Sequence, residues 1–168
     1  MKIHLQSDTH IETGAVLQPG VSSHVAACIG DIGLIKKPDQ LIEYFNGVRE
    51  TTDHIIWVLG NHEFYHHEYF RALDEAAEFA QKHNIHLLDE ALGTENLEID
   101  GVTFWGSTLW TDLKDGDWFA KKKIANGLND YHVVAYDVDG GSRNMSVHDT
   151  IAINTRTREK INWDADVI

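Results

Sequence analysis

Three apolar runs in the first 60 residues predict the strands of a parallel sheet. The first run alternates apolar and polar residues, the other two are almost continuously apolar, and together they cover 1–7, 24–29 and 54–59. Continuous apolar runs are typical of strands covered on both faces, as in α/β proteins. Between the second and third runs, residues 38–49 have a proline in the first turn and apolar side chains at helical spacing. The pattern therefore predicts a β-α-β unit with two parallel strands.

The hydrophobic pattern changes period after residue 66. Apolar residues at helical spacing alternate with charged ones over 67–83, which predicts an amphipathic helix. A short apolar run at 85–88 predicts a further strand. The runs at 96–99 and 102–105 flank Asp100-Gly101, a pair typical of hairpin turns. The chain is therefore expected to continue from parallel into antiparallel pairing.

Weaker patterns follow in the last third of the chain. They predict a helix at 121–127, a loop at 139–142 and a further apolar run at 164–168, and they leave the type of element at 131–136 open, with a strand around His132 as one candidate. Ser146 and Asp149 have the spacing of a capping box, which predicts a helix that runs to about residue 162. No repeat or linker divides the sequence, so we expect one α/β domain over residues 1–168.

Composition and charge narrow the class of protein. The formal net charge of −13 disfavours nonspecific binding to nucleic acid or an anionic membrane, because both are polyanions. The single cysteine, Cys28, lies in an apolar run and excludes both an internal disulfide and a thiolate zinc site. The sequence has no apolar run of transmembrane length and no signal-peptide pattern at its N-terminus. We therefore expect a cytoplasmic protein with no membrane partner.

Each of the three predicted parallel strands is followed by a short polar motif. These motifs are Asp8-Thr9-His10, Gly30-Asp31 and Gly60-Asn61-His62-Glu63. Sites in open α/β sheets lie beyond the carboxyl ends of the strands, so the motifs are expected to meet there. Carboxylate, imidazole and amide donors suit several divalent metals. We therefore predict metal ligation by Asp8, His10, Asp31 and Asn61, with Asp31 shared between two ions.

The last motif also predicts the groups that act on the substrate. Two metals roughly 3.5–4 Å apart would clamp a phosphoryl group and activate a water. His62, next to a ligand, is expected to stabilise the phosphate or protonate the leaving oxygen. Glu63 is expected to orient or tune His62. Glu12 is interpreted as loop, and Asp130 as a solvated or capping residue.

The order of the three motifs resembles that of the calcineurin-like metallophosphoesterases. The residues at 105–112, Trp-Gly-Ser-Thr-Leu-Trp-Thr-Asp, are also similar to a stretch in small bacterial and phage members. The resemblance implies a layered α/β/β/α sandwich and hydrolysis of phosphomonoesters or phosphodiesters at a dinuclear site. It implies Mn²⁺ first as cofactor, with Fe, Zn²⁺ or Ni²⁺ as alternatives.

The sequence departs from that family in its later motifs. Neither Gly-His nor His-x-His occurs in it, and it ends where a further lone histidine is expected. The histidines available as substitute ligands are His66, His67, His132 and His148, and a second chain is another source. The alternative function is therefore a truncated, catalytically impaired phosphoesterase fold that acts as a binding or partner-assembled module. An exposed sheet edge in such a chain would favour a homodimer, and nucleic acid is expected only as a substrate.

Overall fold

A four-stranded parallel sheet is the centre of the computed structural model, which describes residues 1–14, 21–138 and 141–168. The strand order is β1 (Ile3–Gln6), β2 (Ser23–Ile29), β3 (Thr52–Val58) and β4 (His86–Leu87). Parallel pairing of the two continuously apolar strands is confirmed, with Cys28 opposite Trp57. Both of these side chains are fully buried, as expected for strands covered on both faces.

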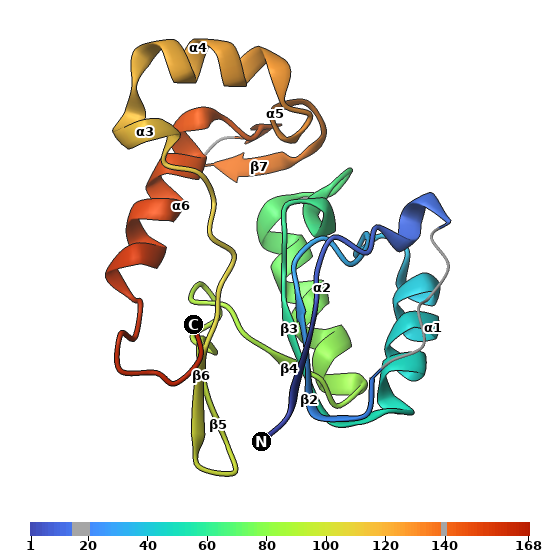
Figure 1. The fold of residues 1–168 in the computed structure, drawn as a ribbon. Helices are drawn as coiled ribbons and strands as arrows, with labels where there is room; N and C mark the ends of the chain where they lie inside the picture. The colour runs from blue at the N-terminus through green and yellow to red at the C-terminus, as the bar shows by residue number, and fades with distance from the viewer. Residues whose placement is uncertain (15–20, 139–140) are drawn as a thin grey trace.

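Helices α1 (Pro38–Arg49) and α2 (Tyr69–Lys82) cover one face of this sheet (Figure 1). Both were expected from the helical spacing of their apolar residues. Phe45 of α1 packs against Trp57 of the sheet, with ring centroids 5.2 Å apart. Phe79 of α2 contacts both rings, so aromatic side chains join the two helices to the sheet.

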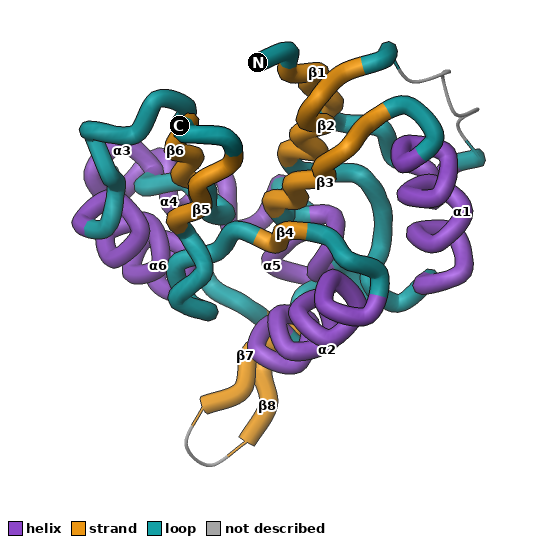
Figure 2. Tube along the Cα trace, turned by 90° about the horizontal axis from the view of Figure 1, so that it is seen from below, coloured by secondary structure: helices purple, strands orange, loops and turns teal. Residues whose placement is uncertain are grey.

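The opposite face of the sheet packs against the predicted hairpin, β5 (Asn96–Ile99) and β6 (Val102–Trp105). Phe104 of β6 also forms a parallel bridge with Val167, so the last apolar run lies beside the hairpin. Helix α6 (Val147–Glu159) lies beyond it, on the side away from the large sheet (Figures 1 and 2). The layers are therefore helix, sheet, short sheet and helix, which confirms the predicted α/β/β/α class.

The remaining elements come between the β5–β6 hairpin and α6 along the chain. They are α3 (Leu113–Gly116), α4 (Trp118–Gly127), α5 (Asp130–Val133), β7 (Ala135–Val138) and β8 (Gly141–Asn144). At 131–136, which the sequence pattern leaves open, the structure has a helical turn followed by β7, and a hydrogen bond from Val134 N–H to the Asp130 carbonyl closes that turn. Of the loop predicted at 139–142, residues 139 and 140 lie outside the described residues, and the other two belong to β8.

The capping box that opens α6 is confirmed. Asp149 accepts hydrogen bonds from the backbone N–H and the hydroxyl of Ser146, at 2.8 and 2.6 Å. Arg143 of β8 donates to both carboxylate oxygens of Asp149. These contacts tie the start of α6 to the β7–β8 hairpin. In the described part of the chain, every helix is too short or too polar to cross a lipid bilayer.

Candidate active site

Backbone hydrogen bonds bring the three strand-end motifs together. The ladder of the sheet continues past the strands, where Asp8 N–H donates to the Gly30 carbonyl at 3.1 Å and His10 N–H donates to the Asp31 carbonyl at 3.0 Å. On the other side of β2, Gly30 N–H donates to the Val58 carbonyl at 2.9 Å. The motifs therefore meet at the carboxyl ends of adjacent parallel strands, as expected for an α/β site.

Three of the predicted metal ligands have a left-handed backbone. The φ angles are 52° at Asp8, 47° at His10 and 54° at Asp31. Such angles are uncommon for residues other than glycine, and the strain is found mostly at functional sites. The left-handed residues turn the chain sharply after β1 and after β2. The backbone itself therefore sets the direction in which these side chains leave it.

The structure places the ligand atoms of Asp8, His10 and Asp31 within 4.8 Å of one another. A second group with the same mutual spacing consists of His10, Glu12 and His62. Two carboxylates and an imidazole are the donors that Mn²⁺, Fe and Zn²⁺ accept. The described residues therefore fit a divalent metal at the end of β1 and β2, and His10 belongs to both groups.

Glu63 makes no hydrogen bond to the ring of His62 among the contacts of the described residues. Its side chain is fully buried, and its carboxylate accepts N–H groups from both neighbouring motifs. The donors are Ile32 at 2.8 Å, Gly60 at 2.8 Å, Asp31 at 3.1 Å and Gly33 at 3.5 Å. Burial raises the pKa of the Glu63 carboxyl to about 7, although the N–H donors oppose the rise. In this arrangement, Glu63 joins the turns after β2 and β3.

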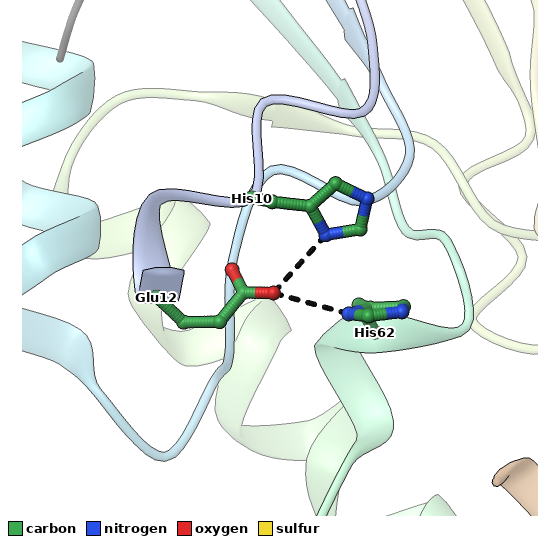
Figure 3. Close-up of side chains that lie close together, drawn as sticks. All are labelled: His10, Glu12 and His62. Carbon is green, nitrogen blue, oxygen red and sulfur yellow. Dashed lines mark hydrogen bonds and ion pairs between the residues drawn. The ribbon is translucent and has the colours of Figure 1, made fainter. Parts of the chain in front are cut away.

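The carboxylate that contacts the candidate catalytic histidine is Glu12, in the short 3-10 helix η1 (Ile11–Thr13) (Figure 3). Its Oε1 atom lies 3.1 Å from Nδ1 of His10 and 3.1 Å from Nδ1 of His62. Burial raises the pKa of this carboxyl. Hydrogen bonds from its own backbone N–H and from the two imidazoles lower the pKa by more than burial raises it, so that the net pKa is below the ordinary value. Its position two residues after His10 was the only signal in the sequence, because His62 is 50 residues away.

Asn61 is held by a chain of two hydrogen bonds from α5. Its amide nitrogen donates to the Tyr65 hydroxyl at 3.2 Å, and that hydroxyl donates to the Asp130 carboxylate at 3.2 Å. The contact assigns the amide nitrogen to Tyr65 and leaves Oδ1 of Asn61 for another partner. Asp130 is buried, which corrects its interpretation as a solvated loop residue. Asp130 lies 65 residues after Tyr65 in the sequence, and no local pattern indicates a contact over that separation.

The site opens into a cleft of about 960 Å³. Four of the predicted site residues line it: Asp8, Asp31, Asn61 and His62. The rest of its wall comes mainly from the hairpin face of the large sheet and from the segment after β6. His62 stacks on Tyr65 in this wall, with ring centroids 4.2 Å apart and planes 25° apart. The cleft thus connects the metal-ligand cluster with a space large enough for a small-molecule substrate.

The four histidines considered as substitute ligands lie outside both ligand groups in the described part of the chain. His67 is buried, and its Nε2 lies 2.9 Å from a carboxylate oxygen of Glu75. His66, His132 and His148 are exposed. The contacts of the described residues therefore give these side chains no place in the metal-ligand cluster.

Gly60 gives a direct test of the close approach between the second and third motifs. A Cβ atom at this position would lie 2.5 Å from the backbone nitrogen of Asp31 and closer still to its carboxylate. We expect Gly60→Ala to lower the free energy of unfolding by about 2 kcal/mol, as overpacking does, and to weaken Mn²⁺ binding. Urea unfolding and calorimetric titration measure the two effects.

The matched control is Gly127→Ala, because a Cβ atom there would meet nothing within 4 Å. This variant is expected to keep both the stability and the metal affinity of the wild type. Equal metal affinities for Gly60→Ala and the control would contradict the close approach seen in the structure.

Comparison with known proteins identifies the fold. No protein-family model matches the chain. Phosphopantetheinyl hydrolase (PptH) from Mycobacterium tuberculosis has a solved structure that matches 99% of this chain and 66% of its own, with a TM-score of 0.64 and 15% identity. The fold is phosphoesterase-like. At this level of identity the match establishes the fold alone.

A relative by sequence comes from a mimivirus. The uncharacterized protein L509 of Acanthamoeba polyphaga mimivirus is 29% identical over an alignment of 145 residues, and the match covers 80% of this chain. The chain spans about half of that relative, 48% of its length. The name of this relative assigns it no activity, so the sequence match adds nothing to the class of reaction.

Proposed function

We propose that this protein is a metal-dependent phosphoesterase that hydrolyses a phosphomonoester or phosphodiester. The observation that carries the proposal is the cluster of ligand atoms from Asp8, His10 and Asp31, which lie within 4.8 Å of one another. The cluster lies at the carboxyl ends of adjacent strands and beside a cleft. The structural neighbour is a phosphopantetheinyl hydrolase by name, which supports the same class of reaction.

The ligands divide between two ions in this proposal. Asp8, His10 and Asp31 would hold the first ion, and Asp31 and Asn61 would contribute to the second. Divalent ions, Mn²⁺ first and Fe, Zn²⁺ or Ni²⁺ as alternatives, supply a Lewis acid for the phosphoryl oxygens and lower the pKa of a water. The left-handed backbone at the three ligands fixes their positions before any ion binds, which reduces the cost of ordering them.

His62 is the proposed catalytic residue. It lines the cleft, and its ring is held between Tyr65 on one side and Glu12 at Nδ1. Its Nε2 atom is the ring nitrogen left for the substrate, where it would donate a proton to the leaving oxygen or a hydrogen bond to the phosphate. Glu63 acts on the same site indirectly, because it holds the turns that carry Asp31 and Asn61.

The proposal is tested by the metal dependence of hydrolysis. The chelated, metal-free protein is expected to be inactive, and Mn²⁺ is expected to restore hydrolysis of p-nitrophenyl phosphate or bis(p-nitrophenyl) phosphate. Elemental analysis of the reconstituted protein is expected to give about two metals per chain. Excess chelator should abolish the activity again.

Two outcomes would contradict the proposal. Binding of metal without hydrolysis by any of Mn²⁺, Ni²⁺, Fe²⁺ or Zn²⁺ would leave a metal-binding module instead of an enzyme. One metal or none per chain, together with no activity, would favour a catalytically impaired fold that acts through a partner.

A further inference from the structure

We infer that Glu12 is the positioning residue of this site, and that its one carboxylate fixes the tautomer and the ring orientation of both His10 and His62. The catalytic consequence of this inference rests on the proposed function, whereas the tautomers are a property of the metal-free protein. The geometry that carries it is shown in Figure 3, where one oxygen of Glu12 faces the Nδ1 atoms of both rings.

Distance and burial distinguish this contact from an ordinary surface ion pair. Both Oε1–Nδ1 distances are 3.1 Å, and the Glu12 side chain is only 11% exposed. The two rings lie against each other edge to face, with centroids 4.3 Å apart. A carboxylate in this place is shielded from water, and its two hydrogen bonds are correspondingly stronger than exposed ones.

The hydrogen bonds determine which ring nitrogen carries the proton. A carboxylate can only accept, so Nδ1 of each ring must donate to Glu12. A neutral imidazole has a single N–H group, and Nε2 is then left with its lone pair. For His10, an unprotonated Nε2 is the form that ligates a metal, and a carboxylate on the other nitrogen also fixes the orientation of the ring. For His62, the same contact leaves Nε2 for the substrate, and this nitrogen can donate there only when the ring carries a proton on both nitrogens, as imidazolium.

The local backbone explains why Glu12 reaches both rings. The left-handed turn at His10 leads directly into η1, so that the side chain two residues later comes back toward His10. Ile11 anchors this turn. Its N–H donates to the Ile32 carbonyl at 3.0 Å, and its buried side chain packs over Gly33, where a Cβ atom would lie 2.6 Å from Ile11 Cγ1. The turn is thus fixed on both sides of the histidine.

Glu63 cannot take this role in the arrangement that the structure shows. All its described hydrogen bonds go to backbone N–H groups of the turns after β2 and β3. The two glutamates therefore have different roles. Glu63 accepts hydrogen bonds from the backbone of the turns, and Glu12 accepts hydrogen bonds from the two imidazoles. This division predicts that the two can be separated by mutation, because loss of Glu12 leaves the turns intact.

The experiment reads the tautomers directly. Long-range ¹H–¹⁵N correlation spectra of the metal-free protein, recorded above the pH at which the histidines are protonated, distinguish Nδ1–H from Nε2–H rings. The wild type is expected to show Nδ1–H at both His10 and His62. Glu12→Ala is expected to lose this form at both rings, while the shortened carboxylate of Glu12→Asp should reach only one of them.

Metal affinity and kinetics give the second readout. Calorimetric titration of Glu12→Ala with Mn²⁺ is expected to show an affinity 10–100-fold weaker, the range for loss of a carboxylate partner of a metal-bound histidine. The hydrolysis assay should show a lower kcat with a smaller change in KM, because Glu12 does not touch the substrate. Glu98→Ala removes the same charge from an exposed position on β5 and is the control for charge alone.

The outcomes separate this inference from the proposed function. Unchanged tautomers in Glu12→Ala, or an Mn²⁺ affinity within twofold of the wild type, would overturn the role of Glu12. If Glu12→Ala does not fold, two unchanged rings in Glu12→Asp overturn it equally. A wild type that neither binds metal nor hydrolyses phosphoesters would refute the proposed function, while the spectra of the metal-free protein would still decide the role of Glu12.

Discussion

Glu63→Ala is expected to lower the free energy of unfolding by about 3–5 kcal/mol. The change removes the acceptor of four backbone N–H groups, and each buried donor left without a partner costs about 1–3 kcal/mol. The N–H of Gly33, at 3.5 Å, contributes least. The Glu63 side chain is fully buried, so water does not replace the lost oxygen atoms as hydrogen-bond acceptors. Urea unfolding, followed by tryptophan fluorescence, measures the loss.

Two further variants define the cause of this effect. Glu63→Gln keeps one acceptor oxygen but turns an NH₂ group toward backbone donors, and about half of the loss is expected. Glu98→Ala changes an exposed glutamate and should stay within about 0.5 kcal/mol of the wild type. A Glu63→Ala protein as stable as the Glu98→Ala control would show that these hydrogen bonds do not hold the turns together.

Asp31→Asn is expected to reduce metal-dependent hydrolysis by at least about 10³-fold, which corresponds to about 4 kcal/mol of transition-state stabilisation. Asp31 belongs to the ligand cluster, and the substitution removes its charge at nearly constant shape. The amide oxygen can still accept the N–H of His62, which the carboxylate accepts at 3.0 Å. The fold should therefore be retained while metal content and kcat fall together.

The matched control for Asp31→Asn is Asp53→Asn, at an exposed position near the start of β3. It makes the same change of charge at the opposite end of the same sheet and should keep full activity. Elemental analysis, thermal unfolding and the hydrolysis assay are measured on both variants. Activity of Asp31→Asn within threefold of the control would contradict a ligand role for Asp31.

Both large effects depend on residues that the sequence pattern had already singled out, but for different reasons. Asp31 was predicted as a metal ligand, and the structure brings it to Asp8 and His10. Glu63 was predicted to act on His62, whereas its described contacts are with backbone amides. Sequence order placed Glu63 next to His62. A 3-10 turn, η2 (His62–Phe64), directs the two side chains to different neighbours.

The elements themselves were accessible from the hydrophobic pattern because their periodicity is local. The helix predicted over 38–49 has the same bounds as α1, and the predicted hairpin pairs as expected around Asp100. The sequence pattern leaves the element at 131–136 open for a reason that is also local. Apolar and aromatic residues there suit either a strand or a buried helical turn, and the short run carries too little periodicity to separate the two.

The sequence by itself determined the order of strands and helices up to the β5–β6 hairpin, the α/β class and the three polar motifs, because each depends on residues close together in the chain. Only the tertiary structure decided which side chains meet. Glu12 reaches a histidine 50 residues away, and Asp130 reaches a tyrosine 65 residues away, through turns whose left-handed angles no periodic pattern encodes. The physical reason is that a hydrogen bond requires two groups within about 3 Å, and that distance is set by the packing of the whole sheet.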